Sequence, residues 1–597
     1  MDDDNEQQGR RLALPEYMAG ALVLMMLLGV LCFRPMGADI IEAHGYLNAG
    51  FVALSAAVWV NALMLVARGI CAVCSRKWPG RFMAIRILVA SIGAFLFAAV
   101  LGGVVDPSFC WLCFMTSLLT GLLTLVCIGS YIRRKIPLTH TSKYTARNSA
   151  YIFLGSLLAL VLVSALILMT PGASLLPLSF TDAFFMSASA ASNTGLATVP
   201  LPETFTWLGL TVLAIDMQLG AMGVMTFTYF VLLVIGRRLA MRDSMAMSSL
   251  LDQDDLSSVP ALIRTVIFVS AVIELTGAAA LYCCWLGNPA VPQDAAGLAG
   301  YALFHTVSTF CNSGLTLFPD NFAAEGIRTA YLSQGVMMLI ILAGTLGFGV
   351  YLEILQRLGR RLRRERNPLR WSTHAWFVLR VTLVLTILGT LSLMLMGIFE
   401  PASHATGIWA NFWDGLWNCI GRSTGINRVD INDYGPLYKI CMMLLMFIGG
   451  NPAGTGGGVF APVFAICVLE VYRELRGERD ILLYNRCISR KTVQRAMCTV
   501  VLCLLWVVAS TMLLLMLEPA IAAQPRGVLD MAFLSVSTFG TSGYSLSDPA
   551  DLGMFSKYVL CCSMIFGRMG MFTALLIFIT PRESPPLKYP ETRLPLT

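Results

Sequence analysis

Two distant segments of the sequence share a short phrase that ends in glycine and is rich in small hydroxyl residues. Residues 306–315 read TVSTFCNSGL, and residues 535–544 read SVSTFGTSGY. Looser copies stand at 187–196 (SASAASNTGL) and at 421–426 (GRSTGI). Glycine accepts positive φ and lets the backbone approach another group closely. Because backbone carbonyls can replace the hydration shell of a cation, the pattern predicts that four such turns supply oxygen ligands for one ion.

The central glycines of these phrases recur about every 110 to 120 residues, a period long enough for a whole structural unit. A short helix that stops at membrane depth directs its carbonyl end, with roughly half a negative charge, at the turn that follows. Four such ends around one axis favour a cation there. The predicted ion-binding residues are Asn193, Thr194, Gly195, Asn312, Ser313, Gly314, Ser423, Thr424, Gly425, Thr541, Ser542 and Gly543.

Each glycine phrase lies between two longer apolar segments, which are predicted to be membrane helices. The pairs cover 149–169 and 204–236, 260–286 and 329–356, 375–398 and 437–471, and 496–517 and 556–580. Asp182, Asp414 and Asp530 stand 11 to 13 residues before their glycines, and the second copy has Tyr301 at the corresponding place. The three aspartates are expected to cap the short helices at their N-terminal ends.

The composition is that of a polytopic membrane protein. Of the 597 residues, 57% are hydrophobic and 13% are charged, and the mean hydropathy is +0.72. Four further apolar segments precede the repeats, at 17–33, 48–67, 87–105 and 110–132. Because the loops that follow the second and fourth of these are basic, the positive-inside rule predicts a cytoplasmic N-terminus. The net charge of +7 lies in such loops and indicates topology rather than nucleic-acid binding.

A glycine-rich loop interrupts the second long helix of the third unit. Residues 449–458 read GGNPAGTGGG, which cannot continue as regular helix. No lysine follows the glycines, so the loop is not a phosphate-binding loop. Backbone of this kind at membrane depth must be buried in protein or line a cavity. Arg568 lies roughly 18 Å along its helix from the polar end at Pro581, so its charge must face water or a partner.

Two other acidic residues, Asp216 and Glu274, fall inside apolar segments. They are interpreted first as hydrogen-bonded structural acids or acids that line a vestibule, and a coupling role for either stays open. The five histidines are scattered without metal-site or catalytic-triad spacing, and the 17 cysteines lie mostly in apolar runs, where a thiol packs as a small hydrophobe.

These motifs resemble the Trk/Ktr/HKT superfamily of potassium transporters, in particular the TrkH and KtrB pore subunits, over about 149–580. Residues 304–322 (FHTVSTFCNSGLTLFPDNF) are similar to the second pore loop of that superfamily almost residue for residue. Residues 421–431 and 535–545 resemble the third and fourth pore loops, and residues 187–198 resemble the first more loosely. "GRMG" around Arg568 is similar to a G-R-[VM]-G motif of the superfamily.

The resemblance implies an all-α polytopic membrane protein with four M1–pore loop–M2 repeats in a pseudo-fourfold arrangement, plus about four additional N-terminal transmembrane helices. It implies K⁺ at the filter carbonyls, no organic cofactor in this chain, a homodimer surrounded by membrane lipid, and a cytosolic RCK-type nucleotide-binding ring (TrkA/KtrA-like). Glycine rather than serine at Gly195 favours potassium. The implied gate residues are Gly449, Gly450, Asn451, Pro452, Ala453, Gly454, Thr455, Gly456, Gly457, Gly458 and Arg568.

The predicted function is potassium uptake across the bacterial inner (plasma) membrane, and no enzymatic activity is expected. The alternatives are a sodium-selective or Na⁺/H⁺-coupled transporter of the same superfamily, or a membrane-embedded enzyme or signalling protein. The predicted domains are accessory helices over 1–147, repeats over 148–245, 258–370 and 371–490 (with the gating loop), and a fourth repeat with a short cytoplasmic tail over 491–597.

Overall fold

The computed structural model describes residues 146–170, 172–223, 259–319, 321–323, 326–362, 371–400, 407–483, 486–571 and 574. The four predicted N-terminal segments lie outside the described residues. The described part is almost wholly helical, with one short antiparallel hairpin of β1 (Leu482–Leu483) and β2 (Arg486–Cys487).

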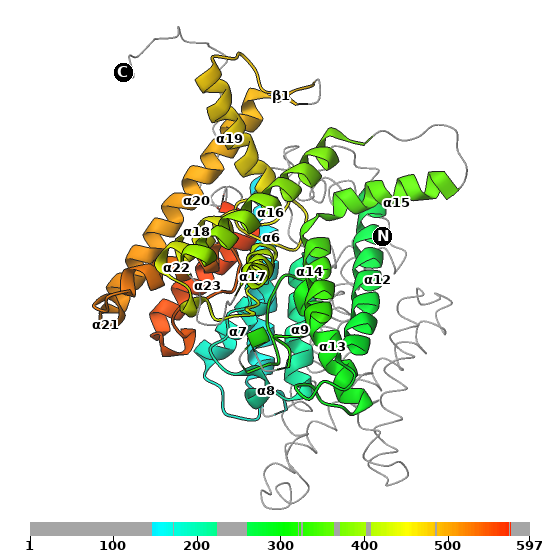
Figure 1. Cartoon of the computed structure of the whole chain (residues 1–597). Helices are drawn as coiled ribbons and strands as arrows, with labels where there is room; N and C mark the ends of the chain where they lie inside the picture. The colour runs from blue at the N-terminus through cyan, green and yellow to red at the C-terminus, as the bar shows by residue number, and fades with distance from the viewer. Residues whose placement is uncertain are drawn as a thin grey trace, which may run out of the picture.

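The helices follow one another in a recurring order of long helix, short helix, turn and second helix (Figure 1). The first stretch is α6 (Ala146–Leu168), α7 (Phe180–Ser192), α8 (Leu201–Thr204) and α9 (Trp207–Met222). The second is α12 (Val259–Trp285), α13 (Ala295–Phe310), η3 (Asn321–Ala323), α14 (Tyr331–Thr345) and α15 (Phe348–Leu362). The third is α16 (Thr373–Phe399), α17 (Ile408–Gly421), η4 (Ile431–Asp433), α18 (Pro436–Phe447) and α19 (Ala461–Arg476). The fourth is α20 (Arg490–Leu517), α21 (Pro519–Ala522), α22 (Gly527–Phe539), η5 (Pro549–Asp551) and α23 (Met554–Met569).

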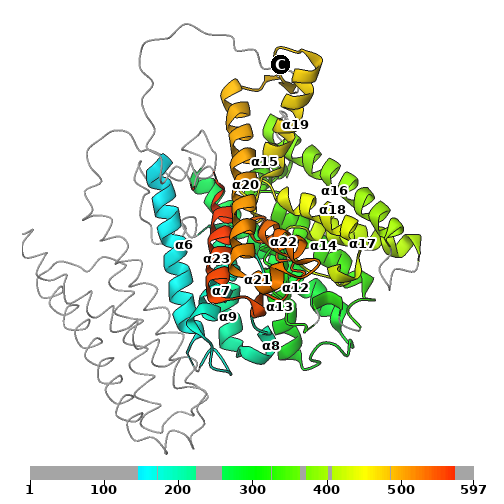
Figure 2. The same cartoon turned by 90° about the vertical axis from the view of Figure 1, so that its left-hand side faces the viewer.

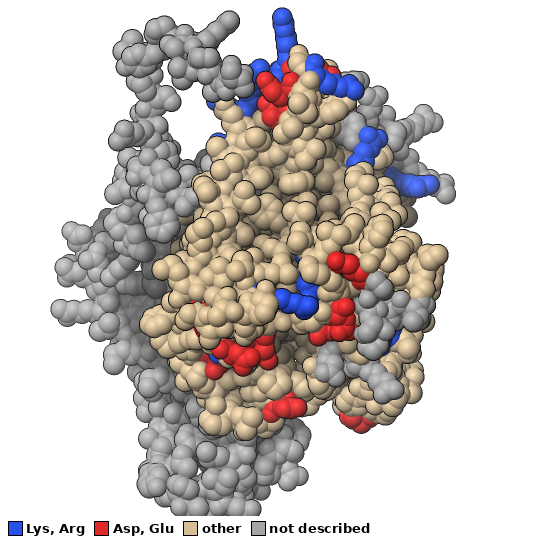
Figure 3. Space-filling model, turned by 60° about the vertical axis from the view of Figure 1, so that its left-hand side comes forward, with Lys and Arg blue, Asp and Glu red and all other residues tan. Residues whose placement is uncertain are grey.

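Three of the described helices, α12, α16 and α20, are long and apolar enough to cross a membrane, and the bent pair α14–α15 makes up to four. In Figure 3 an uncharged band separates the charged residues at the top, where Figures 1 and 2 place α19 and the hairpin, from those in the lower half. Large apolar side chains such as Leu383, Leu388 and Leu505 are exposed on α16 and α20. The long helices therefore present lipid-compatible surfaces.

The starts of the four short helices, α7, α13, α17 and α22, only partly follow the predicted aspartate caps. In α7 the cap is Ser179, whose hydroxyl accepts from the Asp182 amide at 3.1 Å, and Asp182 lies in the first turn. Asp530 lies in the first turn of α22. Asp414 was expected to be a cap but lies in the middle of α17, because that helix already begins at Ile408.

The second stretch does have an aspartate cap, at a position that the predicted pattern missed. Asp294 precedes α13, and its carboxylate accepts a hydrogen bond from the Gly297 amide at 2.7 Å. Tyr301, the residue at the expected position, lies within the helix, where its ring contacts Trp207 of α9 with centroids 6.3 Å apart. The cap was missed because α13 begins six residues before Tyr301.

Three of the second helices end in the same G-x-x-G pattern. The first glycines are Gly220, Gly344 and Gly567, and a Cβ at any of them would overlap a carbonyl oxygen in the last turns of the preceding short helix, at Ala191, Phe310 or Phe539. The second glycines, Gly223, Gly347 and Gly570, have φ of 77°, 83° and 78°. Each second helix is therefore pressed against its short helix and then turns away, as positive φ allows.

The end of α14, at Gly344 and Gly347, corrects one prediction. The segment 329–356 was expected to be one continuous helix, but it breaks at Leu346 and Gly347, and α14 and α15 meet at an angle of 96°. The amide of Phe348 donates to the carbonyl of Ala453 at 2.9 Å, so the break is fixed by the glycine-rich loop of the next stretch. In the first and fourth stretches, 224–258 and 575–597 lie outside the described residues.

Successive stretches are joined by side-chain contacts beside their short helices. Lys557 of α23 pairs with Asp182 of α7 at 2.8 Å. Arg428, which pairs with Asp414 within the third stretch, donates to the Arg328 carbonyl of the second stretch at 3.3 Å. Trp413 of α17 donates to Gln334 of α14 at 2.7 Å. These contacts link the fourth stretch to the first and the second to the third, so the helices close on themselves instead of forming an open row.

We expect Asp414→Ala to destabilise the protein by about 3–5 kcal/mol, because it leaves the buried Arg428 guanidinium without its carboxylate. The unfolding midpoint of the purified protein in detergent measures this. Arg476→Ala is the control, since Arg476 and Glu478 form an exposed pair at 3.8 Å and its loss should leave the midpoint nearly unchanged. Equal shifts for the two variants would contradict a structural role for the buried pair.

Candidate functional site

The four short helices all end three or four residues before one of the predicted glycines. Their last residues are Ser192, Phe310, Gly421 and Phe539. The side chains of the turns are largely buried polar groups, including Thr194, Ser313, Thr424 and Ser542, all with 2% or less of their surface exposed. The carbonyl ends of four helices therefore point toward short, buried turns in which few side chains can cancel their partial negative charge.

Three of the turns share one conformation. Asn193, Asn312 and Thr541 adopt left-handed φ of 58°, 56° and 49°, each two residues before its glycine. The next amide in each turn bonds back to the short helix, as from Thr194 to the Ser189 carbonyl at 2.8 Å and from Ser542 to the Ser537 carbonyl at 2.8 Å. This pattern ends a helix and directs the following peptides away from its axis.

The third turn also ends its short helix, but with a different pattern of backbone hydrogen bonds. The amides of Thr424 and Gly425 both bond to the Gly421 carbonyl, at 2.8 and 3.0 Å. Arg422, just before Ser423, is buried and donates to the carbonyls of Cys419 at 2.7 Å and Ile448 at 3.2 Å. The guanidinium thus connects the end of α17 to the start of the glycine-rich loop.

The four predicted glycines interlock in a closed cycle. Their φ values are 84° (Gly195), 78° (Gly314), 74° (Gly425) and 82° (Gly543). A Cβ at Gly195 would overlap the carbonyl oxygen of Ser313, and one at Gly314 would overlap that of Thr424.

The cycle continues through the third and fourth turns. A Cβ at Gly425 would overlap the carbonyl of Ser542, and one at Gly543 would overlap that of Thr194. Each glycine thus lies against the residue that precedes the glycine of the next turn, and the fourth turn returns to the first. Only a residue without a Cβ permits this approach, which brings four equivalent backbone segments together.

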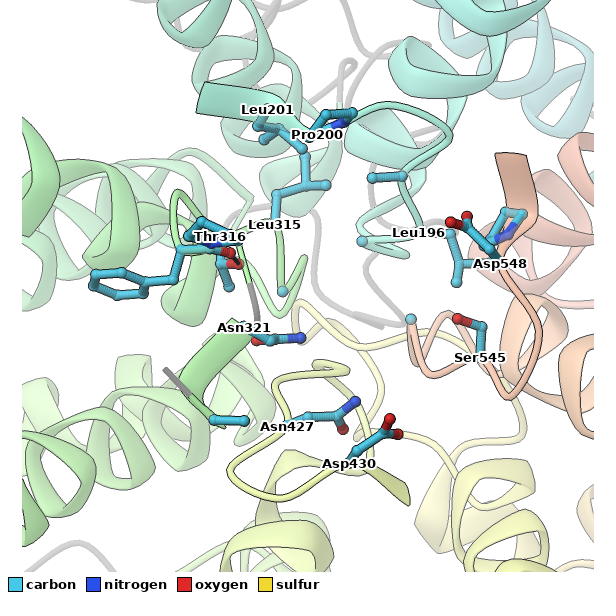
Figure 4. Close-up of a pocket in the computed structure, with 18 of the residues that line it drawn as sticks. Leu196, Pro200, Leu201, Leu315, Thr316, Asn321, Asn427, Asp430, Ser545 and Asp548 are labelled. Atoms are coloured by element: carbon cyan, nitrogen blue, oxygen red, sulfur yellow. Dashed lines mark hydrogen bonds between the residues drawn. The ribbon is translucent and has the colours of Figure 1, made fainter. Parts of the chain in front are cut away.

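A cavity of about 690 Å³ opens over these turns. Figure 4 shows it surrounded by the segments that follow the glycines, with Leu315 and Thr316 on one side, Asn427 and Asp430 on another, and Ser545 and Asp548 on a third. Its charged lining residues are Asp430, Asp433, Asp548, Arg328 and Arg428. Because Arg428 is already paired with Asp414, the cavity carries an acidic excess above the turns.

On the other side of the turns lies the glycine-rich loop. Backbone hydrogen bonds hold the two ends of the loop together. The Gly449 amide donates to the Val459 carbonyl at 2.8 Å, and the Ala461 amide donates to the Gly450 carbonyl at 2.9 Å. Between these two ends, the Gly457 amide donates to the Thr541 hydroxyl at 2.9 Å. The Gly458 amide donates to the Gly567 carbonyl at 3.1 Å.

Asn312 links this loop to two of the turns. Its side-chain amide donates to the Thr455 hydroxyl, which in turn donates to the Phe310 carbonyl at 3.0 Å. Its side-chain carbonyl accepts from Ser423 at 3.1 Å and Thr424 at 2.9 Å. A change in the position of Thr455 must therefore alter the hydrogen bonding of the second and third turns.

Arg568 lies beside the loop and binds carbonyl groups only. Its guanidinium donates to the Thr455 carbonyl and to the carbonyls of Gly220 and Ala221, the latter two at 2.6 and 2.9 Å. Among the ion pairs of the described ranges, none includes Arg568. A full positive charge thus stands next to the loop and ties it to the C-terminal end of α9.

The structure brings together the residues that were predicted as two sets. The predicted turn residues from 193 to 543 meet in the closed cycle, and the loop at 449–458 with Arg568 packs directly against them. The sequence did not reveal that the Asn312 side chain links Thr455 to Ser423 and Thr424. It also did not reveal the role of the paired glycines at the ends of the second helices. The recurrence of G-x-x-G 24 to 30 residues after three of the predicted glycines was a usable signal for the paired glycines.

A family model described as "TrkH: Cation transport protein" matches residues 132–587. The chain is 28% identical over 438 residues to the Ktr system potassium uptake protein B of Bacillus subtilis, covering 72% of this chain and 93% of that protein. It is 27% identical over 426 residues to the potassium/sodium uptake protein NtpJ of Enterococcus hirae, covering 70% and 90%. The fold resembles the crystal structure of the potassium transporter TrkH from Vibrio parahaemolyticus, with a TM-score of 0.59, 17% identity and coverage of 83% and 97%.

We expect Gly425→Ala to destabilise the protein far more than Gly477→Ala. Both glycines have positive φ, 74° and 66°, so an alanine strains the backbone by about 1–3 kcal/mol at either position. Only at Gly425 would the added Cβ also meet backbone, whereas nothing lies within 4 Å of a Cβ at Gly477. Thermal unfolding of the two purified variants makes the comparison, and similar midpoints would show that the cycle is not closely packed.

Proposed function

Because the chain belongs to the TrkH family of cation transport proteins, we propose that it takes up potassium through a pore whose selectivity filter is the cycle of four glycine turns. The observation that carries this proposal is the mutual approach of Gly195, Gly314, Gly425 and Gly543, each against the carbonyl of the residue before the next glycine. Four pseudo-equivalent sets of carbonyl oxygens then surround one axis and replace the water of a monovalent cation.

Helix ends supply the electrostatic part of this filter. The carbonyl ends of α7, α13, α17 and α22 each contribute about half a negative charge toward the axis. No carboxylate is needed at the narrowest point, so the ion is held weakly enough to leave. The acidic excess of the cavity above the turns concentrates cations at the entrance.

The glycine-rich loop and Arg568 form the gate in this proposal. The loop lies under the filter, where its hydrogen bonds to Thr541, Asn312 and Gly567 hold it in the path. Arg568 adds a positive charge that opposes a cation in the same space. Movement of the loop would break the contact between Arg568 and Thr455 and open the way.

The remaining parts of the proposal concern topology and assembly. The repeats occupy 148–245, 258–370, 371–490 and 491–597 after accessory helices over 1–147, the N-terminus is cytoplasmic, and the chain forms homodimers in the inner membrane. Inward potassium movement is driven by the membrane potential, which contributes roughly 2.3 kcal/mol per charge for each 100 mV. A cytosolic nucleotide-binding ring regulates the gate, as the name "Ktr system" of the relatives suggests for a multi-component system.

A sodium-conducting or ion-coupled transporter is the second candidate, and one relative is named a potassium/sodium uptake protein. Glycine at all four filter positions favours potassium, since every turn can present its carbonyls in the same way. The alternative of a membrane-embedded enzyme or signalling protein is set aside, because the family is one of cation transport proteins.

Gly314→Ser is expected to lower the ratio of potassium to sodium flux. The Cβ of serine would displace the Thr424 carbonyl, so one quarter of the filter would lose its geometry. Isotope flux of the two ions into vesicles that contain purified protein measures the ratio. Gly335→Ser in α14 is the control, because nothing lies within 4 Å of a Cβ there. An unchanged ratio in Gly314→Ser would count against the filter assignment.

Deletion of residues 454–458 is expected to increase potassium leak in the absence of any regulatory partner. The deletion removes the Thr455 carbonyl that Arg568 binds and the amides that bond to Thr541 and Gly567. Arg568→Gln is the milder variant, and it should raise the leak without shortening the loop. Flux no greater than that of the parent protein in both variants would remove the gate from the proposal.

A further inference from the structure

Asp216 is a buried carboxyl group that the proposed pore and gate do not use. It lies in α9 with 1% of its surface exposed. The Ser164 hydroxyl of α6 lies 2.6 Å from Oδ1, and the Ser187 hydroxyl of α7 lies 3.3 Å from Oδ2. The carboxyl group therefore joins the long helix, the short helix and the second helix of the first stretch.

None of the charged groups on the surrounding helices compensates a negative charge on Asp216. Asp182 of α7 is paired with Lys557 of α23. Arg568 of α23 donates to backbone carbonyls at the end of α9, and Glu274 of α12 accepts from Gln218 at 2.7 Å. His305 of α13 contacts the Tyr301 carbonyl and the Leu317 amide. The described side chains of α6 include no charged residue. An ionised Asp216 would thus be an unpaired buried charge, which is costly.

The number of hydrogen atoms available for hydrogen bonding also indicates that Asp216 is protonated. Ser187 has one hydroxyl hydrogen but two acceptors within reach, the Val161 carbonyl at 3.0 Å and Asp216 Oδ2 at 3.3 Å. If Oδ2 carries a proton, it donates to Ser187, Ser187 donates to Val161, and Ser164 donates to Oδ1. Three hydrogens then make three hydrogen bonds. If Asp216 is ionised, the single hydroxyl hydrogen of Ser187 can serve only one of its two acceptors, and the other contact has no hydrogen.

The fourth stretch shows that a carboxyl group is not required for packing at this place. The serines at this place in its corresponding helices are Ser510 in α20, Ser535 in α22 and Ser563 in α23. Ser187 and Ser535 each stand eight residues before the filter glycine, and Asp216 and Ser563 each stand four residues before the first glycine of G-x-x-G. Ser510 and Ser535 bond at 3.2 Å, and Ser563 accepts from Trp506 at 3.1 Å. A serine satisfies the site in that stretch.

We propose that Asp216 is a proton-binding site and that its protonation holds the first pore helix, α7, in its transport-competent position. Loss of the proton turns the Ser187 hydroxyl from Val161 toward the carboxylate, which releases the contact between α7 and α6. The flux part of this inference rests on the proposed potassium transport. A sodium ion between Ser164 and Asp216 would hold their oxygens farther apart than the direct hydrogen bond at 2.6 Å.

Infrared difference spectroscopy tests the proton itself and does not depend on transport. Full-length protein at neutral pH should show a C=O stretching band of a protonated carboxylic acid that is lost in both Asp216→Asn and Asp216→Ser. Glu274→Gln is the control for the other buried carboxyl group and should retain this band. An identical carboxylic acid C=O stretching region in the spectra of wild type and Asp216→Asn would overturn the proposal. A change in this region on addition of sodium, seen only in the wild type, would also overturn it.

The pH profile of potassium flux in vesicles tests the consequence. Between about pH 6 and about pH 10, the range in which a buried carboxyl group can titrate, wild-type flux should fall as pH rises. Asp216→Asn should keep its flux, because its amide donates to Ser187 as the protonated acid does, and Asp216→Ser should likewise lose the alkaline decline. Parallel profiles in all three proteins would overturn the link to α7. Absence of potassium flux in the wild type at every pH would instead overturn the proposed function, while the infrared result would stand.

Discussion

The structure depends on one electrostatic constraint, which is that the carbonyl ends of four short helices are held together within a single buried region. Partial negative charges of the same sign repel, and the region is too buried for water to screen them fully. The arrangement persists because each glycine turn lies against the backbone of the next, with no Cβ between them. A monovalent cation at the centre lowers the repulsion, and this makes the proposed ion a structural partner of the turns as well as their cargo.

The surrounding helices supply the mechanical frame for this constraint. Gly220, Gly344 and Gly567 bring the second helices against the short helices, and the ion pair between Asp182 and Lys557 joins the fourth stretch to the first. The third stretch differs, since its second helix is opened by the loop at 449–458. That loop inserts under the turns and makes hydrogen bonds to the second and fourth stretches.

The four stretches are alike in plan and unequal in chemistry. The first has a carboxyl group, Asp216, where the fourth has Ser563, and the fourth has Arg568 where the first has Ala221. The second has the hub residue Asn312, and the third has the buried Arg422. In the proposed function, these unequal residues are the places where a loop, a partner or a proton would act on a single stretch.

The sequence by itself determined the membrane character, the four glycine phrases and the position of the broken helix at 449–458, because apolar run length and glycine content are local properties. It misplaced the cap at Asp414 and missed the 96° bend after Thr345, since that bend is fixed by Ala453 from another stretch. Only the tertiary structure decided that Gly195 meets Ser313 and that Arg568 binds Thr455 and Gly220. Those contacts join residues more than a hundred positions apart, and no local periodicity encodes which carbonyl a given glycine or guanidinium will face.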